Sequence, residues 1–186
     1  MSRATRSETA VLSRTGAGTA AATETGASLP FDWETIRGAL RCGHHLFWLA
    51  TVTRRGSPHV VPVFAAWDDD DRCFVATNAD ARKTRDLIDT GRCVLAANTG
   101  EAHVVVEATA RRVQSSDEME PASTAFREVY DWPTTVAGDE LHAPFAAPTS
   151  GGSPFQVWEL RPTKAFGFAA DGESHAPTRW RFTTSR

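Results

Sequence analysis

The sequence has few cysteines and no long run of apolar residues. Cys42, Cys73 and Cys93 are an odd number in 186 residues and include no C-x-x-C pair, which indicates neither a disulfide framework nor a zinc knuckle. Hydrophobic residues make up 41% of the chain, yet no stretch approaches the roughly 18–20 residues that a membrane helix needs. We therefore expect a protein of the reducing cytoplasm without a membrane-spanning segment.

The chain also has no excess of positive charge. The chain carries 20 basic against 23 acidic residues, with a formal net charge of -3 and a pI near 6.1. Binding to a nucleic-acid backbone requires clustered positive surface, so nucleic acid is not expected as a partner. Lysine is the rarest basic residue, and only Lys83 and Lys164 occur in the whole sequence.

Length and N-terminal composition predict one folded domain. Domains usually run to about 100–200 residues, which leaves no room here for a second one. The segment from Met1 to Ser28 consists mostly of Ala, Thr, Ser, Gly and Arg, and it lacks the apolar core of a secretory signal. This composition predicts a disordered leader over residues 1–29 and a folded domain over residues 30–186.

Apolar spacing and turn residues predict a mainly β chain with about three peripheral helices. Strand runs joined by short polar turns indicate antiparallel pairing, and long valine-rich pairs are typical of a barrel. A long loop rich in Gly, Pro, Ser and Thr is expected over residues 132–154. Helices are predicted over 32–43, 80–90 and 117–131, and strands over 46–53, 58–67, 72–77, 92–98, 102–113, 155–160, 165–169 and 178–182.

The segment from Phe74 to Thr84 carries the clearest chemical signal. A strand delivers Thr77 and Asn78 to a turn, and a helix capped by Asp80 then begins with Arg82 and Lys83 in its first turn. Free backbone N–H groups, a guanidinium and an ammonium at one helix start form a site for a phosphate. From spacing alone, the alternative that Arg82 and Lys83 are ordinary solvated helix residues is the more common case.

At this point the chain from Phe31 to Phe182 resembles the pyridoxamine 5′-phosphate oxidase-related FMN-binding split-barrel superfamily, and within it the flavin/deazaflavin oxidoreductases. The resemblance rests on three blocks: residues 56–63 (GSPHVVPV), Thr77-Asn78 followed after three residues by Arg82-Lys83, and residues 176–182 (APTRWRF). Ala81 stands where many members have serine. The resemblance implies a six- to seven-stranded antiparallel split β-barrel that forms a homodimer, with flavin-type cofactors in grooves between the subunits.

The same resemblance implies a set of cofactor-binding residues. The strand at residues 59–63 is expected to line the flavin ring, and the proline in it suits a backbone that faces a ligand. The other positions are expected beside the phosphate-bearing tail, except the last, which approaches the cofactor of the partner subunit. The residues are His59, Val60, Val61, Pro62, Val63, Ala76, Thr77, Arg82, Lys83, Thr84 and Trp180.

Two functions follow from this resemblance. The first is an oxidoreductase that uses FMN or the deazaflavin F420 to exchange a hydride with a small organic substrate. The second is a protein that binds or carries a flavin, a deazaflavin or haem without turnover, because one fold supports both. The substrate-binding arginine motif of true pyridoxamine phosphate oxidases is not recognisable, so oxidation of vitamin B6 is not expected. No metal site or catalytic acid, base or nucleophile is assigned, since the histidines and serines show no spacing typical of one.

Overall fold

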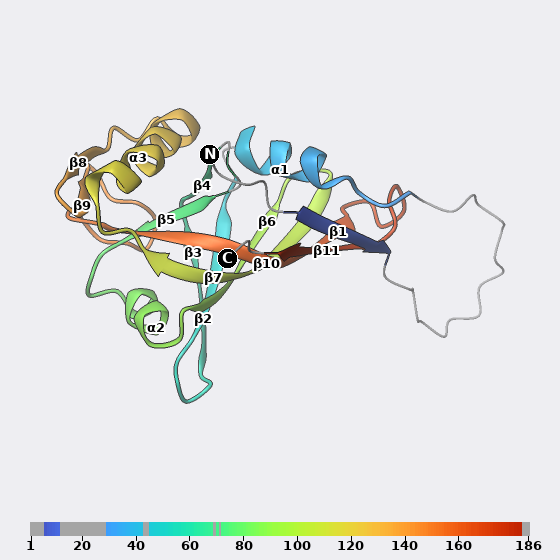
Figure 1. The fold of residues 1–186 in the computed structure, drawn as a ribbon, viewed down its shortest axis with the longest axis horizontal. Helices are drawn as coiled ribbons and strands as arrows, with labels where there is room; N and C mark the ends of the chain where they lie inside the picture. Colours follow the sequence, from blue (N-terminus) through green and yellow to red (C-terminus); the bar gives the residue numbers. More distant parts are fainter. Residues whose placement is uncertain (1–5, 12–28, 43–44, 69, 71, 184–186) are drawn as a thin grey trace.

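The described part of the fold is mainly β, with three helices placed around one large antiparallel sheet (Figure 1). The computed structural model describes residues 6–11, 29–42, 45–68, 70 and 72–183. The helices are α1 (Trp33–Cys42), α2 (Arg82–Thr90) and α3 (Ser116–Tyr130). The strands are β1 (Arg6–Val11), β2 (Phe47–Val52), β3 (Pro58–Val63), β4 (Ala65–Trp67), β5 (Cys73–Thr77), β6 (Arg92–Asn98), β7 (Ala102–Arg112), β8 (Thr135–Ala137), β9 (Glu140–His142), β10 (Gln156–Ala169) and β11 (Thr178–Thr183).

The large sheet has the split-barrel order β1-β11-β10-β7-β6-β2-β3, with β4 and β5 attached to it through β10. Strand β10 connects the β4–β5 pair with the rest of the sheet, because its first residues pair with β5 and its later residues pair with β11. The register of β10 against β7 shifts between Pro162 and Lys164, where proline offers no N–H to the ladder. Within the described ranges β3 pairs with β2 alone and no ladder joins β3 to β5, so the sheet stays open there, and this opening frames the candidate site.

The predicted strand over residues 58–67 is broken at Phe64, where the chain passes from β3 to β4. Tyr130, the last residue of α3, packs against the chain at this break. Its hydroxyl accepts a hydrogen bond from Ala65 N at 3.2 Å and donates one to Ala65 O at 2.8 Å. Its ring stacks on Phe64 with a centroid distance of 4.2 Å. Burial accordingly raises the pKa of the Tyr130 hydroxyl.

Several other boundaries differ from the sequence prediction. The strands expected over 155–160 and 165–169 form one continuous strand, β10, and the loop expected over 132–154 contains the short hairpin β8–β9. The leader was expected to lack structure, but Arg6–Val11 forms β1 and pairs antiparallel with β11. Backbone pairing with a strand edge explains this, since it needs little apolar side-chain burial.

Two apolar clusters fill the molecule. The larger one lies between α1 and the inner face of the large sheet, and the smaller one lies between α3, the β8–β9 hairpin and β5. Trp132 is fully buried in the smaller cluster, where it packs edge-on against Phe126 and Phe155. In the part of the chain described here, no helix is long and apolar enough to cross a membrane.

Close packing in the larger cluster leads to the first prediction. A Cβ added to Gly167 would lie 2.7 Å from Trp180 Cη2 and 3.3 Å from Phe31 Cδ2, and both rings are buried. We expect Gly167→Ala to lower the free energy of unfolding by about 1–3 kcal/mol, because neither ring has room to move. Gly38→Ala in α1 is the matched control, since nothing lies within 4 Å of its added Cβ. The control should gain about 0.5–1 kcal/mol from helix propensity, and equal denaturation midpoints for the two variants would contradict the prediction.

Candidate functional site

The site is built on the turn between β5 and α2. Thr77 ends β5 fully buried, and the Asn78 side chain accepts a hydrogen bond from Asp80 N at 2.9 Å to turn the chain. Helix α2 then starts at Arg82 with Ala81 as its N-cap, which supplies no side-chain hydrogen bond. The expected capping by Asp80 is therefore wrong. The first turn of α2 also holds no acidic residue, so its N–H groups and dipole are not offset by a carboxylate there.

Lys83 points into the protein rather than into solvent. Its side chain is only 2% exposed, and Nζ donates to Thr149 O at 2.6 Å and lies 3.3 Å from Thr149 Oγ1. Burial lowers the pKa of this ammonium from 10.5 to about 8. Among the residues that the structure describes, no carboxylate forms an ion pair with Lys83. A buried cation held only by neutral oxygens is poorly compensated, since buried charges are normally paired.

Arg82 and Thr84 differ from Lys83 in their exposure and in the hydrogen-bonding groups that they leave for a ligand. The Arg82 side chain is 45% exposed, and its Nε lies 3.9 Å from Asp86 Oδ2, which leaves most of the guanidinium accessible. Thr84 is fully buried, and its hydroxyl donates to Asn78 O at 2.7 Å. The Thr84 hydroxyl is therefore already committed to holding the β5–α2 turn in place.

The predicted ring-lining strand is β3, at the open edge of the sheet. Its partner is β2, with Trp48 opposite Pro62 and Ala50 opposite Val60. Val63 is fully buried in the core, whereas Val60 is 53% exposed. The carbonyl oxygen of Pro62 accepts a hydrogen bond from Thr149 Oγ1 at 2.7 Å, so this carbonyl group faces the loop at Thr149.

A loop residue that the sequence did not indicate ties these parts together. Thr149 bonds to Lys83 on α2 and to Pro62 on β3. The next residue, Ser150, is buried, and its hydroxyl donates to Ala76 O at 3.1 Å. Nδ2 of Asn78 donates to Gly152 O at 3.3 Å. The only available signal was the Gly- and Pro-rich loop itself, because the contacts span 66 to 87 residues of sequence.

The structure joins three of the predicted residues, Pro62 of β3, Ala76 of β5 and Lys83 of α2, through hydrogen bonds to the loop at Thr149 and Ser150. Thr77 and Thr84 are linked to each other by their hydroxyls at 3.2 Å, whereas Val63 belongs to the larger core cluster. Trp180 lies in the larger core cluster, fully buried, with its ring 5.3 Å from that of Trp33. The approach of Trp180 to a cofactor of a partner subunit stays a prediction.

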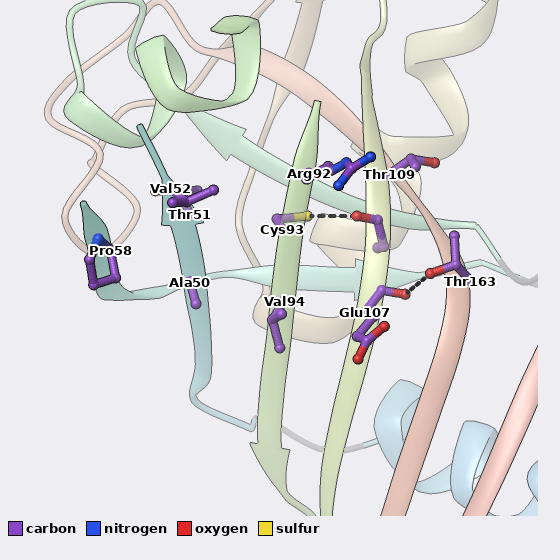
Figure 2. Close-up of a pocket in the computed structure, with 11 residues that line it drawn as sticks. Ala50, Thr51, Val52, Pro58, Arg92, Cys93, Val94, Glu107, Thr109 and Thr163 are labelled. Carbon is purple, nitrogen blue, oxygen red and sulfur yellow. Dashed lines mark hydrogen bonds between the residues drawn. The ribbon is translucent and has the colours of Figure 1, made fainter. Parts of the chain in front are cut away.

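The outer face of the large sheet is apolar and carries a cavity. Residues directly opposite each other in the register point to one face, and here Trp48, Ala96 and Val105 follow one another across three strands. Trp48 is 46% exposed and Phe168 on β10 is 39% exposed. Beside them a cavity of about 550 Å³ opens over β2, β6 and β7, and Arg92 and Glu107 are among the residues that line it (Figure 2). Neither Arg82 nor Lys83 lines this cavity.

Comparison with known proteins gives the context for this arrangement. Residues 33–168 match the family model described as pyridoxamine 5′-phosphate oxidase. No protein with a curated description matches the chain. The likeness to three solved structures, all below 20% identity, concerns the fold alone.

The first of these structures is an FMN-binding protein related to pyridoxamine 5′-phosphate oxidase from Nostoc punctiforme. It is 16% identical with a TM-score of 0.55, and the match covers 87% of this chain and 100% of that one. PhzG from Burkholderia lata, in complex with tetrahydrophenazine-1-carboxylic acid, is 17% identical with a TM-score of 0.52, covering 83% and 88%. A haem-binding protein from Mycobacterium smegmatis is 18% identical with a TM-score of 0.51, covering 79% and 54%.

Proposed function

The chain belongs to the pyridoxamine 5′-phosphate oxidase family, and we propose that it is an oxidoreductase that holds FMN or the deazaflavin F420 by its phosphate. The observation that carries this proposal is the buried ammonium of Lys83 beside Arg82, at a start of α2 that has no side-chain cap. No carboxylate of the described ranges is paired with it. A phosphate there would receive charge-assisted hydrogen bonds from both side chains and the positive end of the helix dipole.

The residues of this chain would bind and orient the cofactor, and the bound ring would supply the hydride chemistry. Arg82 would hold the phosphate from the solvent side and Lys83 from the protein side. The free edge of β3 would present backbone groups to the ring. No acidic or basic side chain is assigned to proton transfer, and we expect a small organic substrate to meet the ring directly.

We further propose that two copies of the chain pair through the outer face of the large sheet. Exposed Leu46, Trp48, Val60 and Phe168 form an apolar surface there that a monomer would leave in water. A second copy is the natural occupant, because a twofold axis lets one self-complementary face cover itself. The open edge at β3 would then lie beside the partner, which completes the groove, and the dimer would have a mass of about 40 kDa, twice 20.2 kDa.

The dimer proposal predicts the effect of a charge on this face. Trp48→Glu should convert a dimer of about 40 kDa into a monomer of 20.2 kDa in sedimentation at micromolar concentration, because an unpaired carboxylate opposes burial. Ile88→Glu is the matched control, since Ile88 is 63% exposed but lies on α2 instead of the outer face. A wild-type monomer, or dissociation by both variants alike, would refute this interface.

Titration of the purified chain with FMN and with F420 tests the proposed cofactor, followed by absorption spectra. Anaerobic reduction of the loaded protein and addition of quinones or enones then tests turnover. An oxidoreductase is reoxidised in a substrate-dependent way, whereas a carrier is not. The second candidate, a carrier of flavin or haem, draws its support from the haem-binding structural neighbour. Haem binding without binding of either flavin-type cofactor would favour that candidate.

A further inference from the structure

Thr149 occupies an unusual position between two parts of the site. Its hydroxyl donates to Pro62 O at 2.7 Å, while its carbonyl oxygen accepts from Lys83 Nζ at 2.6 Å. The hydroxyl oxygen also lies 3.3 Å from Nζ. A single residue therefore connects the lysine of α2 with the free edge of β3.

The backbone of Thr149 is strained to achieve this. Its φ of 55° lies in the left-handed region, which a β-branched residue rarely adopts. Gly151 and Gly152 follow almost directly, so the loop already contains residues suited to such a conformation. The neighbouring Ser150 holds the backbone in this conformation, because it is buried and its hydroxyl donates to Ala76 O. Strain of this kind persists where the surroundings over-determine the geometry, and it is concentrated at functional sites.

We propose that Thr149 is a positioning residue for Lys83, an inference that rests on the proposed function. A lysine side chain loses considerable rotamer freedom when a ligand orders it. Two oxygens of Thr149 take up two of the three Nζ protons before any ligand arrives, and they leave the third for an anion. The ammonium is thereby ordered in advance, so less of the binding free energy is lost on cofactor binding.

Thr149→Gly tests the role of this residue. The change removes the hydroxyl and the conformational restriction while relieving the strained φ. We expect the affinity for FMN to fall about 5- to 20-fold, since Lys83 must then be ordered on binding. Affinity for riboflavin, which has no phosphate, should stay within about twofold. The same pair of measurements applies to F420 and its phosphate-free chromophore. Thr149→Ser, which keeps the hydroxyl, should restore most of the FMN affinity.

Ser153→Ala is the matched control within the same loop. Its hydroxyl bonds only to the backbone of Ala143, away from Lys83, so the FMN affinity should not change. Equal losses for FMN and riboflavin in Thr149→Gly would show a merely structural role and overturn the inference, as would unchanged binding of both. If the wild-type chain prefers FMN over riboflavin while Thr149→Gly binds like wild type, only this inference fails. If the wild type binds no phosphate-bearing form, the proposed function fails and the inference with it.

Discussion

Replacement of Lys83 by methionine should weaken cofactor binding roughly 10- to 150-fold without lowering the melting temperature. A charge-assisted hydrogen bond to a phosphate contributes about 1.5–3 kcal/mol, which corresponds to this loss. Methionine has a similar length and no charge, so it fits the space of a side chain that is 2% exposed. Because burial already disfavours the ammonium, its removal relieves a cost in the cofactor-free protein.

The prediction is specific because the cofactor affinity should fall while the melting temperature should not. Titration of FMN or F420 measures the affinity, and thermal melting of the cofactor-free variant measures the stability. Arg127→Met is the control, because it removes the same charge from an exposed position on α3, where Arg127 contacts Thr124 Oγ1. The control should leave the affinity within about threefold. An unchanged affinity in Lys83→Met would mean that α2 does not hold the phosphate.

Cofactor affinity should also decrease as the pH rises above about 8. Burial lowers the pKa of Lys83 to about 8 in the free protein, and a bound phosphate raises it again. Binding above that pH therefore requires uptake of a proton, so the affinity should fall by up to tenfold per pH unit. The phosphate monoester of FMN reaches its doubly charged form above about pH 6. The highest affinity for FMN is thus expected between about pH 6 and 8.

Stability of the cofactor-free protein should follow the opposite trend over the same range. The folded-state pKa of Lys83 lies below the unfolded value of 10.5, so the unfolded chain binds more protons between about pH 8 and 10.5. The contribution of Lys83 to the free energy of unfolding accordingly rises with pH in this window. In Lys83→Met, the cofactor affinity should no longer decrease above about pH 8, and the free energy of unfolding should lose the part that rises with pH. A wild-type affinity that stays constant from pH 7 to 9.5 would contradict the assignment.

Much of the architecture was predictable because local patterns dominate it. The strand predicted over 92–98 matches β6 at both ends, and the helix predicted over 117–131 lies within one residue of α3 at each end. Ser115 explains the start of that helix, since its hydroxyl accepts a hydrogen bond from Glu118 N at 3.4 Å. The turn from β5 into α2, with Arg82 and Lys83 in the first helical turn, was likewise readable from a short segment.

Other features depend on strand edges and could not be read locally. A polar, small-residue segment such as Arg6–Val11 carries no alternation of apolar residues, and it becomes β1 only because β11 offers a free edge. The position of the Trp180 side chain could not be predicted locally either, although its sequence block resembles a cofactor-binding segment. The fold instead places its ring in the core against Trp33, and only the packing of α1 over the sheet determines this position.

By itself, the sequence determined which residue types gather at the start of α2 and that this start follows a strand. It also determined the family, through motifs that lie within short stretches. Only the tertiary structure decided that Lys83 faces inward while Arg82 stays in solvent, and that Thr149 lies between Lys83 and Pro62. The physical reason is distance along the chain: hydrogen bonds across 66 and 87 residues depend on the loop before β10 returning to the open edge of the sheet.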